Sequence, residues 1–338
     1  MAEPFPRRSG SVPDLRHRLC VAPMMDCTDR HCRYFLRQIS AGAFLYTEMI
    51  TTGALLHGDV ERHLAFGAEE HPLGVQLGGS EPDELARCAK LAESRGYDEI
   101  NLNIGCPSER VQRGAFGACL MAEPELVADC LRAIGETVNI PVTVKHRIGL
   151  DDNEDYDFVQ RFVRIVSEAG CRTFIVHARN AVLKGLSPKE NREVPPLRYE
   201  VVYRLKRDFP HLEFILNGGL TSRAADPRVD GVMLGRAAYH QPWVLADAGN
   251  TRTRVVEKMQ NYCRKHVGSG TSLRHVTRHM LGLYHGHPRA RLWRRMLSDA
   301  ARLSRNDPDL LLEALAAMEA PRGALRPAFS LVPAGRED

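Results

Sequence analysis

Short apolar runs alternate with segments of helical periodicity along most of this 338-residue chain, and few folds accommodate that alternation. Each run is rich in β-branched residues and is followed by a turn signal and then by apolar residues at helical spacing. Eight such units close into a (β/α)8 TIM barrel. The sequence therefore predicts an α/β barrel over residues 13–245. The runs are LCVAPM (19–24), AFLYTEM (43–49), LGVQLGG (73–79), EINLNIG (99–105), PVTVKHRIG (141–149), TFIVHAR (173–179), EFILNGG (213–219) and GVMLGR (231–236).

The rest of the chain divides into a helical part and two tails. Residues 250–318 show at least three helical segments joined by short turns, which predicts a small C-terminal helical bundle. Hydrophobic residues make up 43% of the sequence, which is enough for a large core and excludes a disordered or fibrous protein. We expect the ends, residues 1–12 and 320–338, to be disordered.

Cysteine usage and the N-terminal sequence bear on the cellular compartment. The nine cysteines form no CxxC pair and no close Cys/His cluster, so we expect reduced thiols and no metal site. No apolar run is long enough for a signal sequence or a membrane span. We therefore expect a soluble, cytoplasmic protein that does not contact a membrane. The net charge of +4 is too small to indicate nucleic-acid binding by itself.

Reactive groups in such barrels lie at the carboxyl ends of the strands. Nearly every predicted strand ends in polar residues or glycine. One lysine or histidine at such a position is more often structural than catalytic, but eight such ends on one rim indicate a site. In chain order the ends are Pro23 with Met24, Glu48, Gln76, Asn103 with Cys106, Lys145 with Arg147, His177 with Arg179, Asn217 with Gly218 and Gly219, and Gly235 with Arg236.

The last two strand ends predict a phosphate site. Gly218, Gly219 and Gly235 let backbone N–H groups approach an oxyanion, and Arg236 adds charge. Either pair alone would be interpreted as a turn, but both occur at the two strands where barrels hold phosphate. The sequence has no Walker motif and no GxGxxG after a strand. We therefore expect a phosphorylated cofactor held by the barrel itself, and FMN fits.

A flavin also accounts for the polar residues of the middle strands. Gln76 can donate to and accept from the pyrimidine edge of the isoalloxazine. Lys145 places positive charge beside N1 and O2, where a reduced flavin becomes anionic. His177 can bond the same region or the phosphate; the alternative is a histidine whose bonds are satisfied within the core.

The most specific segment of the chain is residues 101–107, which read NLNIGCP. It occurs with Ala22-Pro23-Met24, Tyr46-Thr47-Glu48-Met49, Gln76-Leu77-Gly78-Gly79, Lys145-His146-Arg147, His177-Ala178-Arg179, Asn217-Gly218-Gly219, Gly235-Arg236, residues 186–193 (LSPKENRE) and residues 275–283 (HVTRHMLGL). Together these segments resemble the tRNA dihydrouridine synthases, and the last two resemble the A-type bacterial subfamily in particular. The resemblance covers residues 18–305.

This resemblance implies an FMN-dependent oxidoreductase that reduces the C5=C6 bond of D-loop uridines, at positions 20 and 20a of tRNA, with NADPH as reductant. It implies that Cys106 is the proton donor and that a helical domain, residues 250–318, helps to bind tRNA at the D-loop and elbow. One departure is His146, where a small residue is expected; its side chain should alternate away from the barrel interior. The residues implied to hold FMN are Pro23, Met24, Met25, Gln76, Lys145, His177, Asn217, Gly218, Gly219, Gly235 and Arg236.

Reduction of uracil explains a thiol at a Gly-Cys-Pro corner. The reaction delivers a hydride from flavin N5 to C6 and then a proton to C5 from the opposite side. A free thiol is mostly protonated at neutral pH, so Cys106 suits the second step. Asn103, on the same strand face, can bond the uracil edge. Cys119 is the rival thiol, but its helix-like surroundings indicate a core position.

The target uridine must leave the RNA stack to reach such a site, so the protein must hold the surrounding backbone. Two basic regions are candidates, a loop after the sixth predicted strand and an arginine-rich helix around Trp293. A charged helix face is usually only solvated, so the second region depends on the resemblance. The predicted contacts are Arg179, Lys189, Asn191 and Arg192 in the loop and Arg291, Arg294 and Arg295 in the helix.

Two other functions share some of these features. An FMN barrel can reduce a small molecule, as dihydroorotate dehydrogenases do, but the basic loop and helical domain would then have no purpose. A non-enzymatic RNA-binding protein could also use a barrel that has lost its flavin. A yellow purified protein would count against the second function, and salt-sensitive tRNA binding would count against the first. We expect a monomer.

Overall fold

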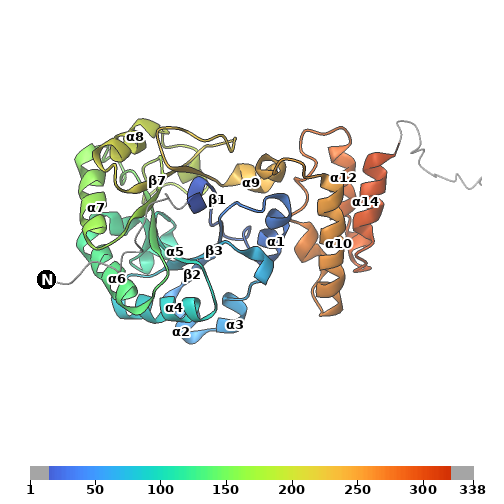
Figure 1. Ribbon diagram of the computed structural model, residues 1–338, viewed down its shortest axis with the longest axis horizontal. Coiled ribbons are helices and arrows are strands. Elements are labelled where there is room, and N and C mark those ends of the chain that lie inside the picture. The colour runs from blue at the N-terminus through green and yellow to red at the C-terminus, as the bar shows by residue number, and fades with distance from the viewer. Residues whose placement is uncertain (1–14, 321–338) are drawn as a thin grey trace, which may run out of the picture. The chain divides into compact units, whose positions relative to one another are not determined.

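The computed structural model describes residues 15–320, and the first part of these forms an eight-stranded parallel barrel (Figure 1). The strand order is β1-β8-β7-β6-β5-β4-β3-β2, and a parallel bridge between Cys20 and Phe44 joins β1 to the chain that enters β2. The predicted (β/α)8 barrel is therefore confirmed. The predicted disordered tails, 1–12 and 320–338, fall outside the described residues except for Ala320.

Each predicted strand has its counterpart, and every start agrees within two residues. All the strands except β2 end before the predicted run does, because the last residues of those runs turn out of the sheet and into the rim. The strands are β1 Leu19–Val21, β2 Leu45–Thr51, β3 Leu73–Gly78, β4 Glu99–Ile104, β5 Val142–Arg147, β6 Thr173–His177, β7 Glu213–Asn217 and β8 Gly231–Leu234.

Helices cover the outside of the barrel (Figure 1). They are α1 Arg30–Ile39, α2 Thr52–His57, α3 Val60–His63, α4 Pro82–Ser94, α5 Glu109–Arg113, α6 Pro124–Thr137, α7 Tyr156–Glu168, α8 Tyr199–Asp208 and α9 Arg236–His240. Single 3-10 turns are η1 Leu15–Arg18, η2 Ala68–Glu70, η3 Gly117–Ala122, η4 Glu190–Arg192 and η5 Pro242–Leu245.

The connection from β7 to β8 departs from the expected strand-helix alternation. Residues 218–230 contain no helix, so the expectation of one after every strand is wrong here. Gly218 and Gly219 both have positive φ, which starts the connection as a turn. Later, the Asp226 carboxylate accepts from the backbone N–H of Arg228 at 3.1 Å, which forms a second turn around Pro227. Thirteen residues with a turn at each end leave little room for a helix.

The barrel interior combines an apolar cluster with buried polar side chains. Each large apolar side chain fully buried in this way contributes about 1.5–3 kcal/mol to stability. The cluster consists of Cys20, Ala22, Phe44, Tyr46, Ile175, Ile215 and Met233, with Met24 packed against it. Ile175 pairs with Ile215 across β6 and β7, and this pair fixes which face of the strands points inward.

The chain divides into two compact units between Ala248 and Gly249, and the second unit is helical. Its helices are α10 Arg252–Gly268, α11 Leu273–Thr277, α12 Ala290–Ser298, α13 Ala300–Leu303 and α14 Leu310–Glu319. Trp293 is fully buried, and its indole N–H donates to the Met280 carbonyl at 2.9 Å. The predicted C-terminal helical bundle is therefore confirmed. Within residues 15–320, no helix has the length and apolar character needed to cross a membrane.

Candidate active site

Strand register collects the predicted polar residues at the carboxyl end of the barrel. Lys145 pairs with Ile175, so it shares the inward face of the apolar cluster, and Asn103 pairs with Lys145. Two residues further along the strands, on the same face, His177 pairs with Asn217. The structure thus brings the predicted residues of β4 to β7 onto one inner rim.

The Cys106 corner is fixed by hydrogen bonds on both sides. The Asn103 side-chain oxygen accepts from the backbone N–H of Gly105 at 3.1 Å and of Cys106 at 3.0 Å. On the other side, the N–H of Ala118 donates to the Cys106 carbonyl at 3.0 Å. Gly117 permits this approach, because its φ is +79° and a Cβ there would lie 2.6 Å from the Cys106 oxygen. The partly exposed thiol is therefore held in a defined position.

Cys119, the rival thiol, lies in the 3-10 turn η3 and is also partly exposed, so the expectation of a core position is wrong. Its Sγ donates to the Phe116 carbonyl at 3.1 Å, and burial followed by the charge of Glu123 raises its pKa. The Cys106 Sγ instead lies 3.6 Å from the Ser108 hydroxyl oxygen. The Cys119 thiol thus bonds within its own turn, whereas Cys106 lies just after β4, on the rim that carries Asn103 and Lys145.

Gln76 is buried in the barrel and bonded to two asparagines of β4. Its Nε2 donates to Asn101 Oδ1 at 2.7 Å, and its Oε1 accepts from Asn103 Nδ2 at 2.8 Å. Its backbone N–H donates to the Thr47 hydroxyl at 3.1 Å. The predicted cofactor residue Gln76 and the predicted substrate residue Asn103 are therefore in direct contact.

Positive charge accumulates on this rim. Burial lowers the pKa of Lys145 from 10.5 to about 7; the charge of Arg147 adds to the shift and Cys106 opposes it. Burial, followed by Arg147 and Lys145, holds the pKa of His177 well below 6.5, so this imidazole is neutral. Arg179 and Arg192 lower the pKa of His177 further. Cations gathered in this way favour an anionic ligand.

Glycines line the rim next to His177. Gly218 has a φ of +113°, and a Cβ there would lie 2.7 Å from His177 Cδ2. Gly219 has a φ of +64°, and a Cβ there would lie 2.6 Å from Leu197 Cδ1. Side chains at both positions would be strained and would fill the space beside the imidazole. Asn217, just before them, donates to the Met233 carbonyl at 2.8 Å and so ties β7 to β8.

The first and last strands complete the rim. Pro23 and Met24 are partly buried after β1, while Met25 is 57% exposed. A Cβ at Gly235 would lie 3.6 Å from the Met24 sulfur, which places the ends of β8 and β1 next to each other. Arg236 forms an ion pair with Glu193, so its charge is partly balanced.

Arg147 is a site residue to which the sequence assigned no function. It is 3% exposed, its Nε donates to the Gly105 carbonyl at 3.2 Å, and its Nη1 donates to the Asn180 and Asn191 carbonyls, both at 3.0 Å. It therefore links the corner before Cys106 to the basic loop. The sequence did contain one signal for this residue: Arg147 lies two positions after Lys145, so the two side chains share one face of the strand.

Two predicted RNA contacts of the basic loop turn inward. Asn191 is fully buried; its Oδ1 accepts from Val182 N at 2.8 Å and its Nδ2 donates to the Val182 carbonyl at 2.9 Å. Arg179 is 9% exposed and donates to the Pro195 and Glu193 carbonyls. The expectation that these two side chains face RNA is therefore corrected: they fold the loop, since its backbone groups need partners.

The remaining predicted RNA contacts face outward. Lys189 and Arg192 are exposed in the loop. Arg291, Arg294 and Arg295, hereafter the α12 arginines, are exposed on the helix that buries Trp293.

His146 follows its predicted direction. It is fully buried, its Nδ1 donates to the Arg147 carbonyl at 2.6 Å, and its ring packs 5.1 Å from Phe162 of α7. Burial lowers its pKa to about 4. It therefore serves packing outside the barrel interior. No group of three potential metal-ligating side chains occurs in the part of the chain that the structure describes.

Comparison with known proteins identifies the family. The model of the dihydrouridine synthase (Dus) family matches residues 20–319. The tRNA-dihydrouridine(20/20a) synthase of Escherichia coli K12 is 55% identical over 313 residues, covering 88% of this chain and 90% of that protein. The protein of the same name from Pseudomonas syringae pv. tomato is 54% identical over 322 residues, covering 91% and 96%. Since the match spans both the barrel and the helical unit, this chain belongs to the dihydrouridine synthase family, whose members are oxidoreductases.

Proposed function

We propose that this protein is a tRNA-dihydrouridine(20/20a) synthase, which reduces the C5=C6 bond of uridines 20 and 20a in the D-loop of tRNA with FMN as cofactor and NADPH as reductant. The observation that carries the proposal is the Cys106 corner, held by Asn103 on a rim that also carries Lys145. The names of the relatives from Escherichia coli and Pseudomonas syringae support the tRNA positions.

The residues of the rim fit FMN. A phosphate needs backbone N–H groups that it can approach and positive charge nearby, and Gly218 and Gly219 keep clear the space beside His177 that a Cβ would fill. The cations Lys145 and Arg147 are close enough to one another to lower the pKa of Lys145. A bound anion would relieve that repulsion. The remaining residues proposed to hold FMN are Pro23, Met24, Met25, Gln76, Asn217, Gly235 and Arg236.

The proposed mechanism divides the work between the cofactor and the chain. FMN, when bound, supplies the hydride that uracil C6 accepts. Cys106 then gives its thiol proton to C5, which leaves a thiolate. The charge of a thiolate at Cys106 raises the pKa of Lys145. Lys145, with a pKa of about 7, holds a proton that can return to the thiolate at neutral pH.

The Asn103 amide has one N–H left for a substrate, because the other donates to Gln76 Oε1. Its oxygen is occupied by the N–H groups of Gly105 and Cys106, so only its Nδ2 can reach a substrate. An N–H donor suits the uracil C4 carbonyl, on which negative charge develops when C6 is attacked. We therefore assign Asn103 to hold the uracil and to stabilise that charge.

We assign tRNA binding to two exposed basic groups. One is Lys189 with Arg192 in the loop that Arg147 ties to the corner before Cys106. The other is the set of α12 arginines. Such contacts to phosphates give affinity that falls steeply with salt. A reductase of small molecules would not need either group.

Two measurements test the proposal. The purified protein should contain non-covalent FMN, and with NADPH it should form dihydrouridine at positions 20 and 20a in tRNA taken from cells that lack it. Mass spectrometry of the digested tRNA locates the product. A protein that neither contains FMN nor can be reconstituted with it refutes the cofactor, and modification only at other positions refutes the assigned uridines.

A further inference from the structure

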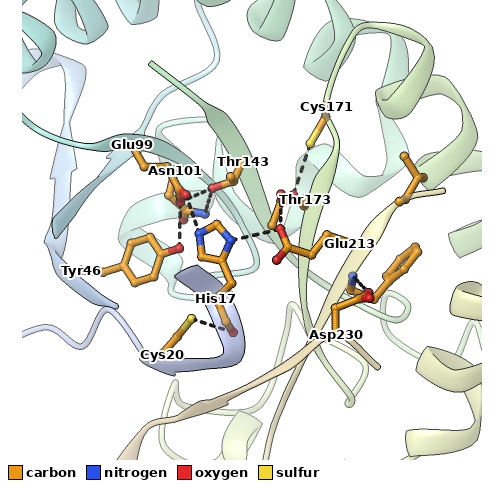
Figure 2. Close-up of polar contacts among 12 residues, drawn as sticks. His17, Cys20, Tyr46, Glu99, Asn101, Thr143, Cys171, Thr173, Glu213 and Asp230 are labelled. Carbon is orange, nitrogen blue, oxygen red and sulfur yellow. Dashed lines mark hydrogen bonds and ion pairs between the residues drawn. The ribbon is translucent and has the colours of Figure 1, made fainter. Parts of the chain in front are cut away.

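A continuous chain of hydrogen bonds runs through the barrel interior below the active site. Figure 2 shows its lower end, around Glu99, Thr143 and Asn101. It follows the inward face of β4, where Glu99, Asn101 and Asn103 occupy alternate positions and are all buried. Barrels of this type are usually filled there by branched apolar side chains. Burying amides and a carboxylate is unfavourable unless each is hydrogen-bonded, so their partners show what the layer does.

The lower half of the chain joins β4 to β5 and β3. Glu99 Oε1 accepts from the Thr143 hydroxyl at 2.6 Å, and Thr143 Oγ1 accepts from Asn101 Nδ2 at 2.8 Å. Asn101 Oδ1 then accepts from Gln76 Nε2 at 2.7 Å. Gln76 pairs with Asn101, and Asn101 with Thr143, in the strand register, so these three side chains form one layer across three strands.

The upper half reaches the corner of the reactive thiol. Gln76 Oε1 accepts from Asn103 Nδ2 at 2.8 Å. Asn103 Oδ1 accepts from the N–H groups of Gly105 and Cys106. Every side-chain link thus donates in one direction, away from Cys106 and toward Glu99.

The two ends of the chain require this direction independently. Backbone N–H groups can only donate, so the Asn103 amide must turn its oxygen to Gly105 and Cys106. A carboxylate can only accept, so the Thr143 hydroxyl must donate to Glu99. Between these ends, the amides of Asn101 and Gln76 each have one orientation that completes the chain. Aligned bonds of this kind reinforce one another in a low dielectric.

Glu99 is itself held as an acceptor from the bottom of the barrel (Figure 2). Its Oε1 also accepts from the Tyr46 hydroxyl at 2.8 Å, and its Oε2 lies 2.7 Å from His17 Nε2. The other nitrogen of His17 lies 3.0 Å from Glu213 Oε2. An imidazole between two carboxylates donates from both nitrogens and is therefore cationic. Burial alone would lower the pKa of His17, but the bonds to Glu213 and Glu99 outweigh it and raise the pKa to about 10.

We propose that Glu99, acting through Thr143 and Asn101, is a positioning residue that anchors the lower end of this hydrogen-bond chain, so that the Gln76 and Asn103 amides are held from both ends and the Cys106 corner is steadied. The inference rests on the proposed function, in which Gln76 contacts FMN and Cys106 donates the proton. If the chain is cut below Asn101, that amide loses the partner that fixes its orientation. Gln76 and Asn103 are then held from the upper end alone, so both amides can move more freely.

Two threonines on the neighbouring strands β5 and β6 provide a matched pair of variants. Thr143→Val keeps the side-chain shape but removes the hydroxyl that links Asn101 to Glu99. Thr173→Val on β6 removes a hydroxyl that donates to Glu213 Oε2 at 2.6 Å. Both changes remove one hydrogen bond from a carboxylate beside His17. Only Thr143→Val interrupts the hydrogen-bond chain that leads to the active site. Thr143→Ser keeps the hydroxyl and should restore wild-type behaviour.

The main measurement is amide hydrogen exchange at Gly105 and Cys106 in the full-length protein, with and without added FMN. In Thr143→Val we expect about tenfold faster exchange of these two amides, because their acceptor Asn103 is no longer anchored from below. The dissociation constant for FMN should rise by a similar factor, about tenfold. Thr173→Val and Thr143→Ser should leave both quantities unchanged. Amides of α7, in the same unit, report any general loss of stability of the barrel.

Unchanged exchange at Gly105 and Cys106 in Thr143→Val would overturn the proposal, and so would an equal acceleration in Thr173→Val. If Thr143→Val does not fold, Asn101→Ala cuts the chain one link higher and leaves the bond between Thr143 and Glu99 in place, and the same two outcomes decide. A protein that binds no FMN would refute the proposed function. Exchange of the Gly105 and Cys106 amides would still test whether the hydrogen-bond chain from Glu99 steadies the Cys106 corner.

Discussion

Two buried cations should affect the stability of this protein in opposite directions when the pH is raised from 7 to 10. The pKa of His17 is raised from 6.5 to about 10, because its bonds to Glu213 and Glu99 outweigh the effect of burial. The pKa of Lys145 is lowered from 10.5 to about 7 by burial and by the charge of Arg147, against the opposing effect of Cys106. Both residues therefore titrate differently in the folded and the unfolded chain.

The signs follow from which state holds the proton. Folded His17 keeps its proton up to about pH 10 while the unfolded chain loses it near 6.5, so its contribution is complete below pH 6.5 and disappears as the pH approaches 10. Lys145 behaves in the opposite way: the unfolded chain keeps the proton up to 10.5, so stability rises as the pH increases from about 7. Each shift corresponds to at most about 5 kcal/mol. In the wild type the two contributions largely cancel.

The variant Lys145→Met separates the contribution of His17 from that of Lys145. With the lysine removed, the His17 contribution is no longer opposed, so the free energy of unfolding should fall between pH 7 and 10, by about 3–4 kcal/mol. The wild type should change much less over the same range. Urea unfolding of both FMN-free proteins at pH 7, 8.5 and 10 gives the two curves, and their difference removes the groups that titrate equally in both. A difference that does not vary with pH would show that Lys145 titrates normally and would refute the reasoning.

Three further changes address the thiol, the RNA surface and the loop. Cys106→Ala should still bind FMN and accept electrons from NADPH but lose about 10²–10⁴-fold in single-turnover tRNA reduction, whereas Cys119→Ala should keep the wild-type rate. Neutralising the three α12 arginines should raise the KM for tRNA and lower its salt dependence, with NADPH oxidation unchanged; equal tRNA affinity would place the binding surface elsewhere. Asn191→Ala should cost about 1–3 kcal/mol of stability in urea unfolding, because it leaves the Val182 backbone groups without that partner, and an unaltered unfolding curve would contradict this.

The barrel could be predicted from the sequence because its signal is local. A run such as EFILNGG contains both the buried strand and the glycines that end it, and β7 begins at the predicted residue, Glu213. Where the local signal weakens, the prediction fails. Residues 218–230 provide a turn at each end and no helix, although the general alternation of the fold favours one.

The direction of a side chain in a loop was not predictable. Asn191 and Arg192 are adjacent and both polar, yet the first is fully buried and the second is exposed. The difference arises because the backbone of Val182 needs hydrogen-bond partners once the loop folds over it. That requirement depends on three-dimensional contacts, so residue type and charge could not separate a residue that folds the loop from one that faces outward.

The segment EINLNIG held a further signal, which appears only once the fold is known. Its polar residues Glu99, Asn101 and Asn103 alternate with isoleucine and leucine, a pattern that normally describes a strand with one face in water. In a closed barrel covered by helices, neither face of β4 meets water. Polar side chains on the inward face must then bond to one another and to neighbouring strands, since unpaired polar groups are costly to bury. Alternation on a strand already assigned to a barrel therefore indicates an internal hydrogen-bond chain, and here that chain ends at the backbone N–H groups of Gly105 and Cys106.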